Sequence, residues 1–122
     1  MTDDMPAIEI ATAAVPDAAV LWLHGLGDDG RGWSDIVRSL PLPAGAAIRF
    51  VFPHAPVMPV SINNGMRMRA WYDIKAANLN ERADLAGVRR SQRDLEALIA
   101  RETARGVAAR RIVLAGFSQG GA

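Results

Sequence analysis

The chain has 122 residues, of which half are apolar and 22% are charged, and its 14 basic and 13 acidic residues give a formal net charge of +1. This composition is typical of one small globular domain and excludes a disordered chain. The sequence shows no cluster of excess basic residues, so it does not indicate a nucleic-acid partner. The longest clean apolar run, residues 18–23, is far shorter than the roughly 20 residues of a membrane span. Because cysteine is absent, disulfides, thiolate zinc sites and a cysteine nucleophile are excluded. The acidic first six residues lack the apolar stretch of a secretory signal, so we expect a cytoplasmic protein.

The first half of the chain predicts a strand, a helix and a second strand. Residues 20–23 are a continuous apolar run, which is typical of a strand buried on both faces. Apolar residues then recur at helical spacing over 33–40, and a proline ends that helix. Residues 48–52 predict the second strand. Three prolines and an N-N-G turn signal make 53–65 an irregular loop.

The second half predicts one long helix and a third strand. Residues 84–105 are periodic, with Asp84 suited to the first turn and Gly106 to the stop. Residues 111–115 predict another buried strand. Short apolar strands alternating with helices favour an α/β fold with a mainly parallel sheet and helices on both faces. Only the glycine-rich residues 116–122 follow the last strand, so we expect 1–122 to be the N-terminal part of a single domain.

The segment G-F-S-Q-G at 116–120 fits the pattern G-x-S-x-G and directly follows a predicted buried strand. In a nucleophile elbow the serine, here Ser118, occupies a strained turn that exposes its hydroxyl. The residues two before and two after the serine approach each other closely, and Gly116 and Gly120 have no side chain to collide. The alternative is a structural turn in which Ser118 caps a following helix.

A second glycine-rich segment, H-G-L-G-D-D-G at 24–30, allows three interpretations. Its glycines match the dinucleotide-binding pattern G-x-G-x-x-G. However, Asp28 and Asp29 stand where phosphates would sit, and no acidic residue for a ribose follows the second strand. The segment also suits a hydrolase loop that donates one oxyanion-hole amide. An ordinary strand-to-helix turn is the third interpretation.

Four segments, in order, resemble the bacterial carboxylesterases, which are relatives of the acyl-protein thioesterases and lysophospholipases. They are L-H-G-L-G-D at 23–28, P-H-A-P at 53–56, M-R-A-W-Y-D-I at 68–74 and G-F-S-Q-G-G-A at 116–122. The resemblance covers essentially the whole chain. It implies an α/β-hydrolase fold and hydrolysis of carboxylic esters or thioesters without metal or cofactor.

The resemblance also implies roles for individual residues. Ser118 would be the nucleophile, and the backbone amides of Leu26 and Gln119 would form the oxyanion hole. The segment 57–71 would lie over the acyl pocket.

Other residues remain open between packing and function. Trp71 and Tyr72 suit either the core or the wall of an acyl pocket, and His24 suits a structural loop histidine or a pocket residue. The pairs Arg89-Arg90 and Arg110-Arg111 are expected to face solvent. Two histidines 30 residues apart without cysteine are poor support for zinc.

The chain departs from the family pattern after Ser118, because family members carry Asp and then His downstream of the serine. Only four residues follow Ser118, and none is Asp or His. An upstream triad with His54 and either Asp73 or Asp84 would match the order of chymotrypsin-like proteases, but those are all-β proteins.

We therefore expect the triad Asp and His downstream of the given residues. The 122-residue chain alone would then be inactive and in need of the rest of its domain. A non-catalytic half-domain that needs a partner chain, and a nucleotide-binding α/β domain, are the alternatives. The sequence leaves homo-oligomers open.

Overall fold

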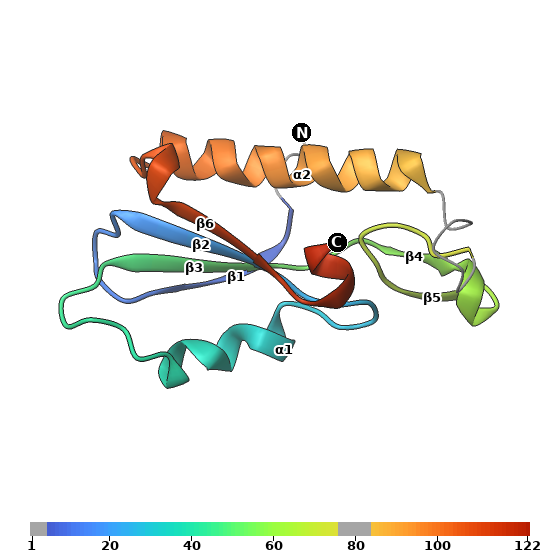
Figure 1. Ribbon diagram of the computed structural model, residues 1–122, viewed down its shortest axis with the longest axis horizontal. Helices are drawn as coiled ribbons and strands as arrows, with labels where there is room; N and C mark the ends of the chain where they lie inside the picture. The colour runs from blue at the N-terminus through green and yellow to red at the C-terminus, as the bar shows by residue number, and fades with distance from the viewer. Residues whose placement is uncertain (1–4, 76–83) are drawn as a thin grey trace.

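A four-stranded sheet forms the centre of the protein, whose computed structural model describes residues 5–75 and 84–122 (Figure 1). Its order is β1-β3-β2-β6, with bounds β1 Ala7–Ala11, β3 Ile48–Pro53, β2 Ala18–Leu23 and β6 Ile112–Gly116. Strand β2 runs parallel to both of its neighbours, β3 and β6, whereas β1 pairs with β3 in the antiparallel direction. The mainly parallel α/β sheet expected from the sequence is confirmed. The burial expected for the third strand is not found, because β6 lies at the edge of the described sheet and Val113 and Leu114 are exposed.

Helix α2, Leu85–Ala104, covers one face of this sheet (Figure 1). The Asp84 side chain caps it by accepting a hydrogen bond from the Gly87 N–H at 3.0 Å. Its second half packs on the sheet through Leu98, which shares the core cluster with Leu21 of β2. The first turns differ from the prediction, because Leu85 lies exposed beyond the edge of the packed core.

The opposite face of the sheet is covered by the short α1, Arg31–Ser34, and the 3₁₀ turn η1, Asp35–Ser39 (Figure 1). The helix predicted over 33–40 is therefore only partly correct. Its apolar face is still used, because Trp33 packs against Trp22 of β2 with ring centroids 5.4 Å apart. The apolar spacing over 33–40 therefore reflects contact with the sheet and not a regular α-helix.

The irregular loop predicted at 53–65 is wrong in its second half. Strands β4, Val57–Val60, and β5, Met66–Arg69, form an antiparallel hairpin that includes the 3₁₀ turn η2, Ser61–Asn63. Asn64 and Gly65 make the reversal at φ values of 57° and 78°. These are the left-handed conformations that an Asn-Gly turn provides.

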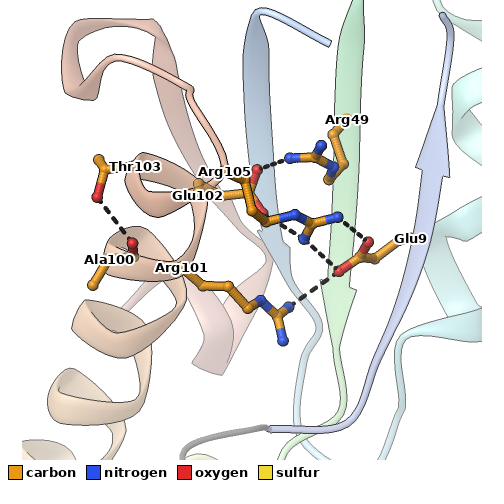
Figure 2. Close-up of polar contacts among 7 residues, drawn as sticks. All are labelled: Glu9, Arg49, Ala100, Arg101, Glu102, Thr103 and Arg105. Carbon is orange, nitrogen blue, oxygen red and sulfur yellow. Dashed lines mark hydrogen bonds and ion pairs between the residues drawn. The ribbon is translucent and has the colours of Figure 1, made fainter. Parts of the chain in front are cut away.

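Strand β1 is not predicted by the sequence pattern, and a group of charged side chains ties it to α2 (Figure 2). Fully buried Glu102 accepts from Arg49 of β3 at 2.5 Å and from Arg105 at 3.1 Å. Arg105 also pairs with Glu9 of β1 at 2.9 Å, and Arg101 pairs with the same carboxylate at 3.2 Å. We call Glu9, Arg49, Arg101, Glu102 and Arg105 the charged cluster. It joins the C-terminal end of α2 to two neighbouring strands.

Candidate active site

Strand β6 leads directly into a sharp turn at Ser118. The ladder between β2 and β6 ends with the Phe117 N–H donating to Leu23 O at 3.0 Å. Phe117 is still extended, but Ser118 has φ of 53°, and the 3₁₀ turn η4, Ser118–Gly121, begins there. Few non-glycine residues adopt a positive φ, and such strain concentrates at functional sites.

Two glycines make this turn sterically feasible. A Cβ on Gly116 would collide with the backbone of Gly120 and Gly121. A Cβ on Gly120 would collide with the carbonyl groups of Leu23 and His24, at the end of β2. The turn therefore lies tight against both its own strand and the loop that follows β2.

That loop, 24–30, passes beside the serine. A Cβ placed on Gly25 would lie 3.6 Å from Ser118 Cβ, so the two segments are in contact. The Gly27 N–H donates to Arg69 O of β5 at 2.9 Å, which ties the loop to the hairpin. In the described part of the chain, the backbone N–H groups of Leu26 and Gln119 donate to no other protein atom.

The loop does not suit a pyrophosphate. The Asp28 carboxylate lies where a Cβ on Gly32 would be, and the Asp29 carboxylate accepts from the Arg31 N–H at 2.8 Å. The first turn of α1 thus faces the protein's own carboxylates. Helix α1 itself has only four residues, which leaves little dipole for a phosphate.

The His24 ring is a structural element of the loop. Its Nδ1–H donates to Gly25 O at 2.7 Å, and its Nε2 accepts from the Ala55 N–H at 3.0 Å. The ring is buried and packs against Trp71 with centroids 5.2 Å apart. Both ring nitrogens are therefore used by the backbone.

His54 also bonds to this loop. Its Nδ1 accepts from the Gly30 N–H at 2.9 Å. Burial, with a further contribution from the Arg69 guanidinium, lowers the pKa of His54 below its usual value of 6.5. Neither histidine forms a hydrogen bond with Ser118 among the residues that the structure describes.

Asp73, considered for an upstream triad, is engaged elsewhere. Its carboxylate accepts from the Ser61 N–H at 2.7 Å and from the Ser61 hydroxyl at 2.6 Å. These hydrogen bonds hold the pKa of Asp73 below its usual range. Asp84 caps α2 and also accepts from the Asp73 N–H at 2.7 Å. Both carboxylates fasten backbone segments.

Sequence reasoning missed the Gln119 side chain and two residues of α2. The Gln119 amide accepts from the Trp71 N–H at 2.9 Å and donates to Tyr72 O at 2.8 Å. Arg90 donates to Trp71 O at 3.0 Å, and the Ser91 hydroxyl donates to the same oxygen. The expectation that Arg90 faces solvent is therefore wrong, and the pattern carries no signal of its partner 19 residues away.

A cavity of about 270 Å³ lies between α2 and η4. Trp71, Tyr72 and Gln119 line it together with Ser91 and Leu95 of α2, whereas Ser118 and His24 do not. Trp71 and Tyr72 also belong to the buried core cluster, so they serve packing as well as this cavity.

The described residues show neither a metal-binding cluster nor a helix suited to span a membrane. Over 5–75 and 84–122, no three His, Cys, Asp or Glu side chains gather in a way that could hold a metal ion. No helix in that part of the protein is both long and apolar enough to cross a membrane.

Comparison with known proteins agrees with the fold and the motifs. The profile of the phospholipase/carboxylesterase family matches residues 5–122. The chain is 48% identical over 117 residues to acyl-protein thioesterase 1 of Yarrowia lipolytica, covering 94% of this chain and 52% of that protein. It is 42% identical over 120 residues to acyl-protein thioesterase 1 of Schizosaccharomyces pombe, covering 98% and 53%.

Solved structures give the same result. Acyl-protein thioesterase 2 of Zea mays superposes with a TM-score of 0.76 at 31% identity, covering 96% of this chain and 48% of the other. SOBER1 of Arabidopsis thaliana gives 0.78 at 32% identity, covering 84% and 50%. The chain thus spans about half the length of the relatives that it matches. The chain belongs to the phospholipase/carboxylesterase family and has the α/β-hydrolase fold.

Proposed function

We propose that the protein is a serine hydrolase that cleaves carboxylic esters or thioesters through an acyl-enzyme on Ser118. The observation that carries this proposal is the backbone of Ser118, at φ 53° between a parallel strand and a glycine-tight turn. This conformation presents the hydroxyl at the carboxyl end of the sheet, which is the position a nucleophile needs. A serine that merely capped a helix would not require the strain.

The oxyanion hole would consist of the backbone N–H groups of Leu26 and Gln119. The contact between Gly25 and Ser118 supports this pairing, as does the absence of any acceptor for either N–H in the described residues. Donors of this kind stabilise charge that appears only in the transition state. Losing one of them typically lowers the rate by roughly 10²–10³-fold.

The general base and its carboxylate partner would lie beyond residue 122. His24 and His54 both accept backbone N–H groups, which supports a third histidine as the base. In the reaction, this base takes the Ser118 Oγ proton as Oγ bonds to the acyl carbon. The same proton then leaves with the alcohol or thiol, and water releases the acid from the acyl-enzyme.

The acyl group would lie along the β4–β5 hairpin. Val57 and Met66 of this hairpin are exposed apolar residues. The hydrogen bond from Gly27 to Arg69 holds the hairpin beside the loop that carries Leu26. The names of the relatives support thioesters of acylated proteins as one substrate class.

Hydrolysis by a completed protein tests this proposal. Residues 1–122 are fused to the C-terminal half of the Yarrowia lipolytica relative, and this fusion is called the completed protein below. We expect turnover of a short-chain nitrophenyl ester and of an acyl thioester. The change Ser118→Ala should lower turnover by at least about 10³-fold.

The matched control is Ser39→Ala, an exposed serine at the end of η1, which should retain full turnover. A folded completed protein whose turnover survives Ser118→Ala would contradict the proposal.

A further inference from the structure

Trp71 makes hydrogen bonds with three separate segments although it lies outside every helix and strand. Its side chain is buried, with 3% of the residue exposed. Its N–H donates to Gln119 Oε1 at 2.9 Å, and its indole Nε1–H donates to His24 O at 2.8 Å. Its carbonyl oxygen accepts from Arg90 and Ser91 of α2. Every polar group of Trp71 is thereby used.

Two of these three segments are the ones that carry the proposed oxyanion donors. His24 lies two residues before Leu26, and the indole bond to His24 O is backed by packing of the His24 ring on Trp71. Gln119 carries the second donor itself. One residue is therefore bonded to both segments that carry the proposed donors.

The bond to Gln119 restrains the backbone as well as the side chain. The Gln119 amide is buried and binds two successive residues, accepting from Trp71 and donating to Tyr72. Such a two-point attachment leaves the amide little freedom to rotate. Because both polar atoms of the side-chain amide are held, the side chain limits rotation of the Gln119 main chain, whose N–H is the proposed donor.

The third segment anchors Trp71 itself. Helix α2 packs on the sheet through Leu98, and Arg90 and Ser91 of that helix donate to the Trp71 carbonyl. The position of Trp71 is thus set by the core of the protein, independently of the loop and the elbow.

We propose that Trp71 is a positioning residue that sets the separation and orientation of the Leu26 and Gln119 amides. This inference rests on the proposed function, and it adds a residue that does not touch the reacting atoms. Misplacement of a catalytic group by about 1 Å can cost roughly 10²-fold in rate. Loss of the Trp71 bonds should therefore lower kcat and leave KM nearly unchanged, because the oxyanion exists only in the transition state.

Two substitutions in the completed protein remove the two connections separately. Trp71→Phe keeps an aromatic ring against His24 but deletes the donor to His24 O. Gln119→Met keeps the length of the side chain but deletes both of its hydrogen bonds. We expect Trp71→Phe to lower kcat by roughly 10- to 100-fold, with KM within about twofold.

Matched controls separate positioning from folding. Trp22→Phe deletes an indole N–H that is buried without a partner among the described residues, and Gln92→Met changes an exposed glutamine on α2. Both should leave kcat unchanged. The midpoint of urea unfolding is measured for every variant.

The outcomes distinguish this inference from the proposed function. A fall in kcat with constant KM in either Trp71→Phe or Gln119→Met, absent from the controls, supports it; one folded variant suffices. The positioning role of Trp71 is overturned if both variants fold and keep kcat within twofold, or if only their unfolding midpoints fall. In that case Ser118-dependent turnover of the parent still supports the proposed hydrolase function. A folded parent without such turnover overturns both.

Discussion

Ser118 has a left-handed backbone that costs an ordinary residue about 1 kcal/mol, so the surrounding structure must hold it there. The packing of Gly116 and Gly120 against neighbouring backbone supplies that restraint. This feature could be predicted, because a serine between two such glycines, directly after an apolar run that predicts a strand, is typical of a sharp turn centred on the serine. Its proposed role as the nucleophile stays a prediction.

Substitution of the second glycine measures how tight the turn is. In Gly120→Ala the new methyl group would meet the carbonyl groups of Leu23 and His24. We expect the free energy of unfolding of the completed protein to fall by about 3 kcal/mol, as in overpacked cores. The control is Gly45→Ala, where φ is 82° but no atom lies within 4 Å, so only the backbone penalty of about 1 kcal/mol applies. Equal effects of the two changes would show that the turn has room for a side chain.

His54 predicts a pH dependence of stability. Because its pKa is lowered in the folded protein, the unfolded chain binds this proton more readily. The stabilisation is complete above the unfolded value of about 6.5 and is lost as the pH falls through the lower folded value. Protonation would also place a hydrogen on the Nδ1 atom that accepts from Gly30.

Urea unfolding at pH 7.5 and 5.5 measures this effect. His54→Asn, whose side-chain oxygen can still accept from Gly30, should lose less stability between the two pH values than the parent. A loss as large as that of the parent would assign the pH dependence to other groups.

The role of the Gln119 side chain could not be predicted. The motif identifies this residue by its backbone amide, whereas its side chain binds residues 47 and 48 positions earlier. Nothing in local spacing specifies contacts over such a separation. The same holds for Arg90, whose charge favours solvent.

At the scale of elements, the strands of the sheet centre were the easiest to predict. Strands β2, β3 and β6 are short apolar runs, and their alternation with helices along the chain favoured a mainly parallel sheet. The β4–β5 hairpin was harder, because Pro59 interrupts β4 and the alternation of Met and Arg in β5 extends over only four residues. Pairing across the Asn64-Gly65 turn forms this hairpin, in which Val60 is the only buried residue of the two strands.

The charged cluster fixes the end of α2 on the sheet, and its buried member predicts a large effect (Figure 2). Glu102→Gln would leave Arg49, which is almost buried, without its counter-charge. Breaking a buried ion pair costs about 3 kcal/mol or more. We expect a loss of that size in the free energy of unfolding of the completed protein.

The control for this change is Glu96→Gln, on the exposed side of the same helix, which should cost less than about 0.5 kcal/mol. If the two variants are equally stable, the charged cluster does not hold α2 in place.

At the scale of the whole molecule, the β6 edge of the described sheet is apolar and exposed. Strand β6 is the last strand in the described sheet, and its residues Val113 and Leu114 are 56% and 51% exposed. An exposed apolar edge strand favours association with other chains. Residues 1–122 expressed alone should therefore elute in size exclusion as oligomers or aggregates, and the completed protein should not. A stable monomer of residues 1–122 would show that this edge needs no cover.

The most direct test of the central claim is covalent labelling with a fluorophosphonate, which reacts only with an activated serine. The completed protein is incubated with the probe, and its intact mass and proteolytic peptides are then measured. We predict a single adduct on Ser118, which is absent from Ser118→Ala and from residues 1–122 alone, because the proposed base lies outside those residues. An adduct on another serine, or none on a folded completed protein that hydrolyses esters, would contradict the assignment of Ser118 as the nucleophile.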